Sequence, residues 1–253
     1  MVGAGKNVNT RKISMDKKDI SIATIAWARD DEEERLLISS LQQLAKLNIP
    51  VFITDGGSRK SFLDFLKSIP NFTLLQHDEH GLWHQARISL NAAAKFGTKF
   101  IFYTEPDKKD FFENHLEKML DDIEVNELSG ITLASRSKKA FETFPAFQQM
   151  TETTINNCCK EVTDKELDFT YGPFLLNSKL VAQMQELPAN IGWGWRPYAF
   201  CISSIQGYNI DHFLGDFFCP ADQQTDDAQG RIYRMKQLAQ NIEGITLSAT
   251  FKK

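Results

Sequence analysis

The segment Lys99-Phe-Ile-Phe-Tyr-Thr-Glu-Pro-Asp-Lys-Lys-Asp110 is the part of the sequence around which the rest is organised. Its first half is aromatic and β-branched and is bounded by polar residues, which predicts a short buried strand over 100–103. Pro106 ends that strand, because proline has no N–H to donate to a sheet ladder. Glu105 and Asp107 flank the proline, so two carboxylates at the strand exit are offered to a hard cation such as Mg²⁺ or Mn²⁺.

The same carboxylates have a second interpretation that involves no ligand. Asp107 or Asp110 could cap the helix expected to follow, with Glu113 reaching back toward the cap. Residue types alone do not separate a cap from a metal ligand, so both interpretations stay open at this point.

Composition places the chain among soluble globular proteins and excludes several function classes. The 253 residues are 42% hydrophobic and 25% charged, and they suffice for one large domain with a full core. The net charge of −4 argues against a nucleic-acid partner, since phosphate backbones require clustered Lys and Arg. The four cysteines form no Cys-x-x-Cys pair. There is no apolar signal core and no apolar run near the ~18 residues of a membrane span, so we expect no transmembrane segment and a cytoplasmic location.

Strand and helix patterns alternate through the first half of the chain. We expect residues 1–18 to be a polar N-terminal tail and residues 19–253 to form a single domain. Strands are predicted over 20–27, 49–54, 72–76 and 99–103, each followed by an amphipathic helix, which indicates a mostly parallel sheet with helices on both faces. Ligands of such sheets lie outside the carboxyl ends of the strands, where Arg29, Asp55, Asp78 and the 105–107 turn fall.

The second half alternates less regularly. We predict a strand over 131–135 that leads into a basic segment at Arg136, and helices over 146–162, 198–206 and 230–241 with a strand over 208–213. Two segments, 169–174 and 191–197, are rich in aromatic residues, glycine and proline. Loops of that composition commonly line a binding site.

Three short segments follow one another along the chain at a characteristic spacing. They are 54–58 (Thr-Asp-Gly-Gly-Ser), 81–87 (Gly-Leu-Trp-His-Gln-Ala-Arg) and 104–107 (Thr-Glu-Pro-Asp). In this order the chain resembles the GT-A fold glycosyltransferases, or nucleotide-diphospho-sugar transferases, of the family-2-like or mannosylglycerate-synthase-like kind, over roughly residues 20–215. The resemblance implies an α/β fold of GT-A type, with a Rossmann-like sheet and a smaller acceptor-side C-terminal part. Residues 19–125 would be the nucleotide-sugar-binding half and 126–253 the acceptor-side half.

The resemblance also implies roles for single residues. Asp55 would contact the nucleoside, Arg87 would lie near the base or diphosphate, and Glu105 and Asp107 would hold the divalent metal that bridges the two phosphates. The residues implied to bind the nucleotide sugar are Ala26, Arg29, Asp55, Gly56, Arg87, Glu105 and Pro106. Asp55 as an ordinary turn residue and Arg87 as a solvated helix residue are the alternatives.

Two features depart from the family pattern. Glu105 stands where the family has aspartate, and 192–196 (Gly-Trp-Gly-Trp-Arg) stands where inverting members carry a Glu-Asp pair. The catalytic base therefore lies elsewhere, or the reaction retains configuration, or catalysis has been lost. The residues expected on the acceptor side are Arg136, Tyr171, Gly172, Trp193, Trp195 and Arg196. The two tryptophans could stack on an acceptor sugar or could pack in the core or a lid.

The function predicted is a metal-dependent glycosyltransferase that uses Mg²⁺ or Mn²⁺ and moves a sugar from a nucleotide-diphosphate donor to a small-molecule or glycan acceptor. A non-catalytic relative that binds a nucleotide sugar is one alternative. A sugar-1-phosphate nucleotidyltransferase is the other. It would require a glycine-rich loop with Arg or Lys directly after the first strand, and 26–30 (Ala-Trp-Ala-Arg-Asp) is not such a loop.

Overall fold

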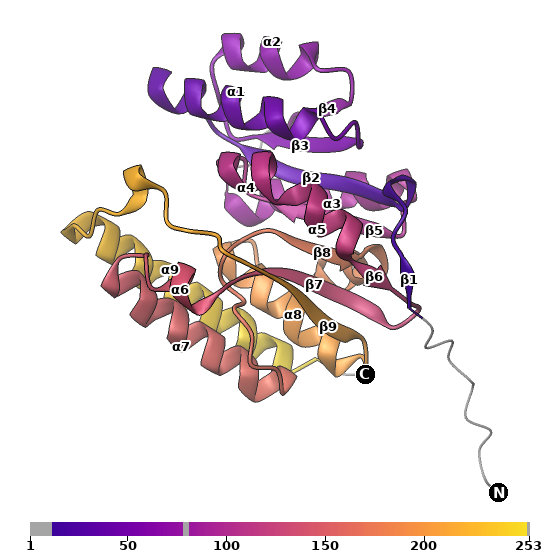
Figure 1. Cartoon of the computed structure of the whole chain (residues 1–253), viewed down its shortest axis with the longest axis vertical. Helices are drawn as coiled ribbons and strands as arrows, with labels where there is room; N and C mark the ends of the chain where they lie inside the picture. The colour runs from indigo at the N-terminus through magenta and orange to yellow at the C-terminus, as the bar shows by residue number, and fades with distance from the viewer. Residues whose placement is uncertain (1–11, 78–80, 252–253) are drawn as a thin grey trace, which may run out of the picture.

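A seven-stranded sheet runs through the whole molecule (Figure 1). The computed structural model describes residues 12–77 and 81–251. The strands lie in the order β4-β3-β2-β5-β8-β7-β9. Their bounds are β2 Ile20–Ala26, β3 Val51–Asp55, β4 Phe72–Leu75, β5 Phe100–Thr104, β7 Ser129–Arg136, β8 Phe174–Asn177 and β9 Asn209–Gly215.

The sheet is mostly parallel, as predicted. Strands β4, β3, β2 and β5 pair in parallel, and so do β7 and β9. Only β8 runs antiparallel to both of its neighbours, β5 and β7, and it joins the two halves of the chain into one sheet. A short ribbon of β1 (Ile13–Ser14) and β6 (Glu124–Val125) lies apart from the sheet.

Helices cover both faces of the sheet. In chain order they are α1 Asp31–Ala45, α2 Lys60–Ser68, α3 Leu82–Phe96, α4 Lys109–Asn114, α5 Leu116–Asp122, α6 Lys138–Phe141, α7 Ala146–Thr163, α8 Trp195–Ile205 and α9 Ala228–Ala249. Short 3₁₀ helices lie at Lys17–Asp19, Ser178–Met184, Gly192–Gly194 and Ala221–Gln223.

Two hydrophobic clusters correspond to the two faces, because successive side chains of a strand point to opposite sides. Phe100 and Phe102 of β5 belong to the cluster beneath α1, α2, α4 and α5. Ile101 and Tyr103 belong to the cluster beneath α3 and α8. Helices α7 and α9 pack on α8 and on each other and form an outer layer beside the C-terminal half (Figure 1).

Local sequence signals account for several helix ends. Asp30 caps α1 by accepting hydrogen bonds from the backbone N–H groups of Glu32 and Glu33. Helix α3 ends at Gly97, whose φ of 95° lies in the left-handed region that favours glycine.

Other segments differ from the predictions. The helix expected after Asp110 is divided into α4 and α5 at His115, and α9 is longer than expected at both ends. Of the expected tail, residues 12–18 belong to the fold, because Ile13 and Ser14 pair with β6. Residues 1–11 and Asp78 lie outside the described residues. Strand β8 was not predicted.

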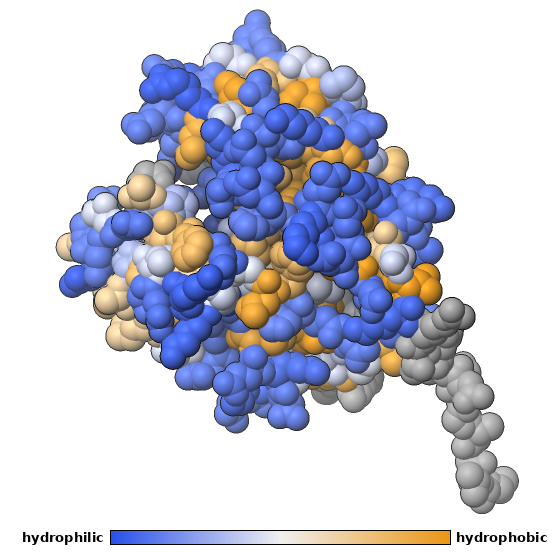
Figure 2. Space-filling model, in the orientation of Figure 1, coloured by the Kyte–Doolittle hydropathy of each residue, from blue (hydrophilic) through white to orange (hydrophobic). Residues whose placement is uncertain are grey.

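The face of the molecule in Figure 2 is mostly hydrophilic, and its apolar side chains form small patches between the helices. Across the part of the chain that the structure describes, no helix is long and apolar enough to cross a membrane.

Candidate functional site

The carboxyl end of β5 carries an ion pair that the sequence did not predict. Glu105 Oε1 accepts a hydrogen bond from Arg196 Nη1 at 2.8 Å, and the two side chains are only 13% and 12% exposed. Arg196 Nη2 also donates to the backbone carbonyl of Gly172 at 3.1 Å. Glu105 and Arg196 lie 91 positions apart in the sequence, so the fold unites a residue expected on the donor side with one expected on the acceptor side.

Two other carboxylate oxygens at this place are buried. Glu105 Oε2 and Asp107 Oδ1 have no hydrogen-bond partner among residues 12–77 and 81–251. An unpaired buried acceptor costs about 1–3 kcal/mol, and more when it is charged, so these oxygens favour the presence of a cationic partner. Carboxylate oxygens are the ligands that Mg²⁺ and Mn²⁺ prefer, so the donor set fits the ion that the fold family implies.

The capping alternative does not describe Asp107. The N-cap of α4 is Lys108, which makes no side-chain cap hydrogen bond. Asp110 accepts a hydrogen bond from Asn114 Nδ2 at 2.8 Å instead. Within the described chain no group of three or more His, Cys, Asp or Glu could hold a metal, so a metal held by Glu105 and Asp107 would take further ligands from substrate phosphates or water.

Gly172 and Tyr171 lie beside Glu105. Gly172 has a φ of +137°, and a Cβ at this position would collide with Glu105 Oε2. Glycine is therefore required here both by the backbone and by the position of the free oxygen. The Tyr171 ring stacks on Phe217 with 4.7 Å between centroids, and Lys108 Nζ lies 5.0 Å from the tyrosine ring.

Trp195 belongs to the hydrophobic core, which corrects the expectation that it faces an acceptor. Its side chain is 0% exposed. Its ring lies 5.5 Å from that of Trp83 and 4.7 Å from that of Tyr103, between centroids. Burial, reinforced by the negative charge of Glu105, raises the pKa of Tyr103 well above its usual value. Trp195 therefore packs in the core and does not stack on an acceptor sugar.

Arg136 is also a correction, because its guanidinium is enclosed and paired with two carboxylates. It pairs with Glu152 and with Asp168 at 2.7 Å each, and it donates to Thr170 Oγ1 at 2.9 Å. The side chain is 1% exposed. An arginine with this burial and these partners holds the protein together and is closed off from an acceptor substrate.

The glycines around Trp193 serve a close approach to α9. A Cβ on Gly194 would collide with the backbone carbonyl of Gln240, and a Cβ on Gly244 would collide with that of Gly194. Trp193 itself is half-buried and donates from Nε1 to Tyr233 Oη at 3.0 Å. The glycine- and tryptophan-rich composition predicted a loop that lines a ligand, but Gly194 and Trp195 serve packing instead.

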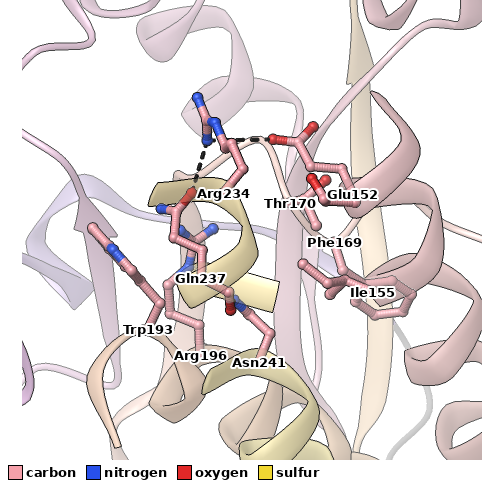
Figure 3. Close-up of a pocket in the computed structure, with 10 residues that line it drawn as sticks. Glu152, Ile155, Phe169, Thr170, Trp193, Arg196, Arg234, Gln237 and Asn241 are labelled. Atoms are coloured by element: carbon pink, nitrogen blue, oxygen red, sulfur yellow. Dashed lines mark hydrogen bonds and ion pairs between the residues drawn. The ribbon is translucent and has the colours of Figure 1, made fainter. Parts of the chain in front are cut away.

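A small cavity of about 50 Å³ lies between α7, α8 and α9 (Figure 3). Trp193 and Arg196 line it from one side and Glu152 from the other. Arg234 of α9 lies 3.9 Å from Glu152 and donates to Gln237 Oε1 at 2.9 Å, as Figure 3 shows. Of the six expected acceptor residues, two therefore line this cavity.

On the expected donor side, Asp55 is a turn residue, and its Oδ1 has no hydrogen-bond partner among the described residues. Its Oδ2 accepts from the backbone N–H groups of Gly57 at 2.7 Å and Ser58 at 2.8 Å. The Gly56 N–H donates to the carbonyl of Ala26 at 2.7 Å, which ties the turn to the end of β2. Asp55, Gly56 and Ser58 line a cavity of about 450 Å³.

The two arginines expected on the donor side have protein partners. Arg29 Nε donates to Glu33 at 2.9 Å, and its guanidinium lies 5.8 Å from the centroid of the exposed Trp27 ring. Arg87 Nη2 lies 3.3 Å from His84 Nδ1. Pro106 lies in the turn after β5 between the two metal-ligand candidates.

Sequence reasoning missed His77, which lines the 450 Å³ cavity at the end of β4. The available signal was topological, because β4 is a parallel strand and His77 follows its carboxyl end.

The comparisons with known proteins bear on the fold. No family model matches the sequence, and no curated protein matches it either. Solved structures do match. The mannosyltransferase from Pyrobaculum calidifontis, in complex with GDP-Man and Mn²⁺, has a TM-score of 0.60 and 14% identity, over 98% of this chain and 69% of its own.

Glucosyl-3-phosphoglycerate synthase from Mycobacterium tuberculosis, in complex with Mn²⁺, UDP and phosphoglyceric acid, matches with a TM-score of 0.59 and 12% identity, over 92% of this chain and 80% of its own. The same enzyme with phosphoglyceric acid alone gives a TM-score of 0.61 at 11% identity. At such identities the likeness concerns the fold alone, and the chain has the GT-A fold of the nucleotide-sugar transferases.

Proposed function

We propose that this chain is a metal-dependent glycosyltransferase that moves a sugar from a nucleotide-diphosphate donor to a small-molecule or glycan acceptor. The observation that carries the proposal is the pair of buried, unpartnered carboxylate oxygens, Glu105 Oε2 and Asp107 Oδ1, at the exit of β5. They lie at the carboxyl end of β5, which pairs in parallel with β2, and β2 in turn pairs with β3; these two strands end at Ala26 and Asp55. The structural neighbours bound to Mn²⁺ with GDP-Man or UDP support the same assignment.

Glu105 and Asp107 would hold the divalent ion, which supplies positive charge to the diphosphate that departs when the sugar is transferred. Arg196 fixes Glu105 through Oε1 and leaves Oε2 free. Its guanidinium adds a second positive charge close to that site, and positive charge aimed at the leaving group stabilises the transition state. Asp55 would bind the nucleoside from the adjacent turn.

On the acceptor side, we assign Trp193 and Arg196 to the wall that faces the acceptor. Both line the small cavity between α7, α8 and α9. Arg196 Nε is buried without a partner in the described part of the chain, so it has a donor to offer to a hydroxyl, carboxylate or phosphate. Tyr171 and Gly172 complete this side beside Glu105.

A specific observation also favours a second candidate, a relative that binds a nucleotide sugar without transferring it. The Arg196 guanidinium neutralises Glu105, and Glu152, which lines the acceptor cavity, is held by Arg136. A carboxylate engaged in this way is a poor general base.

The test is release of nucleoside diphosphate from sugar nucleotides of uracil, guanine, adenine and cytosine in the presence of Mn²⁺. We expect turnover with at least one donor and a loss of about 100-fold or more in Asp107→Asn, because the site loses a charge but little volume. Asp110→Asn, an exposed aspartate three positions later, is the matched control and should retain the full rate.

Full turnover in Asp107→Asn would refute the metal assignment. Tight binding of a sugar nucleotide without release of diphosphate from any donor would support the non-catalytic candidate instead.

A further inference from the structure

Two of the three charged side chains that line the small cavity between α7, α8 and α9 are arginines, Arg196 and Arg234 (Figure 3). Arg196 Nε is buried and has no hydrogen-bond partner among the described residues. Arg234 donates to two neutral amides, Gln237 Oε1 at 2.9 Å and Gln148 Oε1 at 2.8 Å, and it lies 3.9 Å from Glu152. The cavity wall therefore presents two guanidinium groups and a buried N–H donor that is available to a ligand.

Glu152 is the third charged residue of the lining, and other side chains hold its carboxylate. Oε2 accepts a hydrogen bond from Arg136 Nη2 at 2.7 Å, and Oε1 accepts one from Gln148 Nε2 at 2.7 Å. The side chain is only 8% exposed. A general base must take the proton of an attacking hydroxyl within hydrogen-bond distance, whereas both oxygens of this carboxylate already bind donors. This wall suits an acceptor oxygen that is already ionised and has no proton to lose.

We infer that the acceptor is a phosphate monoester and that one of its phosphate oxygens is the nucleophile that attacks the sugar. The inference rests on the proposed function and specifies its acceptor. The bond between carbon 1 of the sugar and the diphosphate breaks, and its electron pair leaves with the diphosphate. A lone pair of the phosphate oxygen forms the new bond to carbon 1. No proton moves in this step, and the product is a glycosyl phosphate diester.

Charge and size both favour a phosphate group in this cavity. A phosphate monoester carries about 1.5–2 negative charges at pH 7 and three acceptor oxygens, which two guanidinium groups match. The cavity of about 50 Å³ exceeds the ~10–15 Å³ that one water needs and is far below the ~300 Å³ of a typical small-molecule site, so it takes one small group. Arg196 Nη1 donates to Glu105, so a phosphate bound to Arg196 Nε would lie beside the proposed metal site.

The first experiment measures the binding of methyl phosphate to the full chain by calorimetry in EDTA, so that no metal contributes. We expect saturable binding that weakens at least about tenfold in Arg234→Gln, the size of one charge-assisted hydrogen bond. Because Arg234 is 32% exposed and donates to amides, its replacement should leave the fold intact, and urea denaturation checks this.

Arg231→Gln is the matched control, because Arg231 lies on the same helix, is exposed and pairs with Asp226. It should bind methyl phosphate as tightly as the wild-type protein. Two results would overturn the inference, namely no saturable binding to the wild-type protein, or an unchanged affinity in Arg234→Gln.

The second experiment compares methyl phosphate with glycerol as the acceptor, with Mn²⁺ and sugar nucleotides of uracil, guanine, adenine and cytosine. We expect methyl phosphate to raise the release of nucleoside diphosphate at least about tenfold over hydrolysis, because it is a bound nucleophile. Mass spectrometry should then detect a glycosyl methyl phosphate, and glycerol should leave the rate near that of hydrolysis. Transfer to glycerol but not to methyl phosphate would overturn the inference and leave the proposed function in place. No release of diphosphate with either acceptor would overturn both.

Discussion

The proposed donor side and the proposed acceptor side of this molecule differ in how far the protein satisfies its own polar groups. The donor-side cavity measures about 450 Å³, and three polar atoms of its walls have no protein partner in the described structure. The proposed acceptor-side cavity measures about 50 Å³. Glu152 and Arg234 in its walls bond to other side chains, and Arg196 Nε is a polar atom of its lining that has no partner among the described residues. The first region thus has a large cavity with several unpaired polar atoms, whereas the second is largely filled by the protein.

Helix α9 is the cause of the difference. It packs on α7, α8 and the Gly192–Gly194 turn, and the turn approaches it so closely that no side chain fits at Gly194 or Gly244. Glycine and tryptophan therefore serve helix packing on the acceptor side. On the proposed donor side, Gly56 and Gly57 of the turn after β3 lie in the wall of the larger cavity. The same residue types thus indicate a site in one region and a packed interface in the other.

The largest effect is expected from the two tryptophans, which separate packing from binding within one turn. Trp195→Ala should lower the free energy of unfolding by about 3–5 kcal/mol, because a fully buried ring is lost from among Trp83, Tyr103 and Phe174. Trp193→Ala should cost less than about 1 kcal/mol in stability, since it removes one hydrogen bond from a half-buried ring. Its effect should be a raised KM for the acceptor. Urea denaturation measures the stability of both variants, and acceptor kinetics measure the KM of Trp193→Ala. Equal losses of stability in the two variants would contradict the assignment of Trp195 to the core and of Trp193 to the acceptor side.

A similar loss of stability is expected when the buried charge cluster of Arg136, Glu152 and Asp168 behind the proposed acceptor cavity is broken. Arg136→Met should destabilise the protein by about 3–5 kcal/mol, because it leaves the carboxylates of Glu152 and Asp168 buried without their cation. Arg231→Met, which breaks an exposed pair with Asp226, is the matched control and should leave the denaturation midpoint unchanged. If both variants unfold at the same urea concentration, Arg136 has no structural role and its assignment to the acceptor returns.

Acid should weaken the same cluster by a smaller amount. Burial opposes ionisation of Asp168, but the charge and hydrogen bonds of Arg136 outweigh it and lower the pKa of Asp168 from 3.8 to about 2. A carboxyl group whose pKa is lowered by folding stabilises the protein above its unfolded pKa and loses that contribution as the pH falls. We therefore expect about 2 kcal/mol to be lost between about pH 4 and pH 2. In Asp168→Asn this part of the pH dependence should be absent; an identical pH profile would contradict the assignment.

The sequence predicted the features that depend on local patterns. Short apolar runs followed by Asp55 and Glu105 located β3, β5 and the exits where the donor site is proposed. Strand β8 could not be found in this way, because its four residues are fixed by antiparallel pairing with β5 and β7, which lie far away in the chain. The burial of Arg136 and Trp195 likewise depends on α7 and α8, whose positions no local pattern gives. His77 was missed because a single histidine carries no motif.

The most direct test of the metal site is the thermal stability of the full chain with a nucleoside diphosphate, in Mn²⁺ or in EDTA. With UDP or GDP at ~100 times its dissociation constant and Mn²⁺ present, we predict an added stability of about 2.7 kcal/mol. EDTA should abolish most of it, because Glu105 and Asp107 can bind the diphosphate only through a cation. Asp107→Asn should lose the same increment while melting normally without ligand, and Asp110→Asn should keep it. Equal stabilisation of the wild-type protein in EDTA would contradict the account.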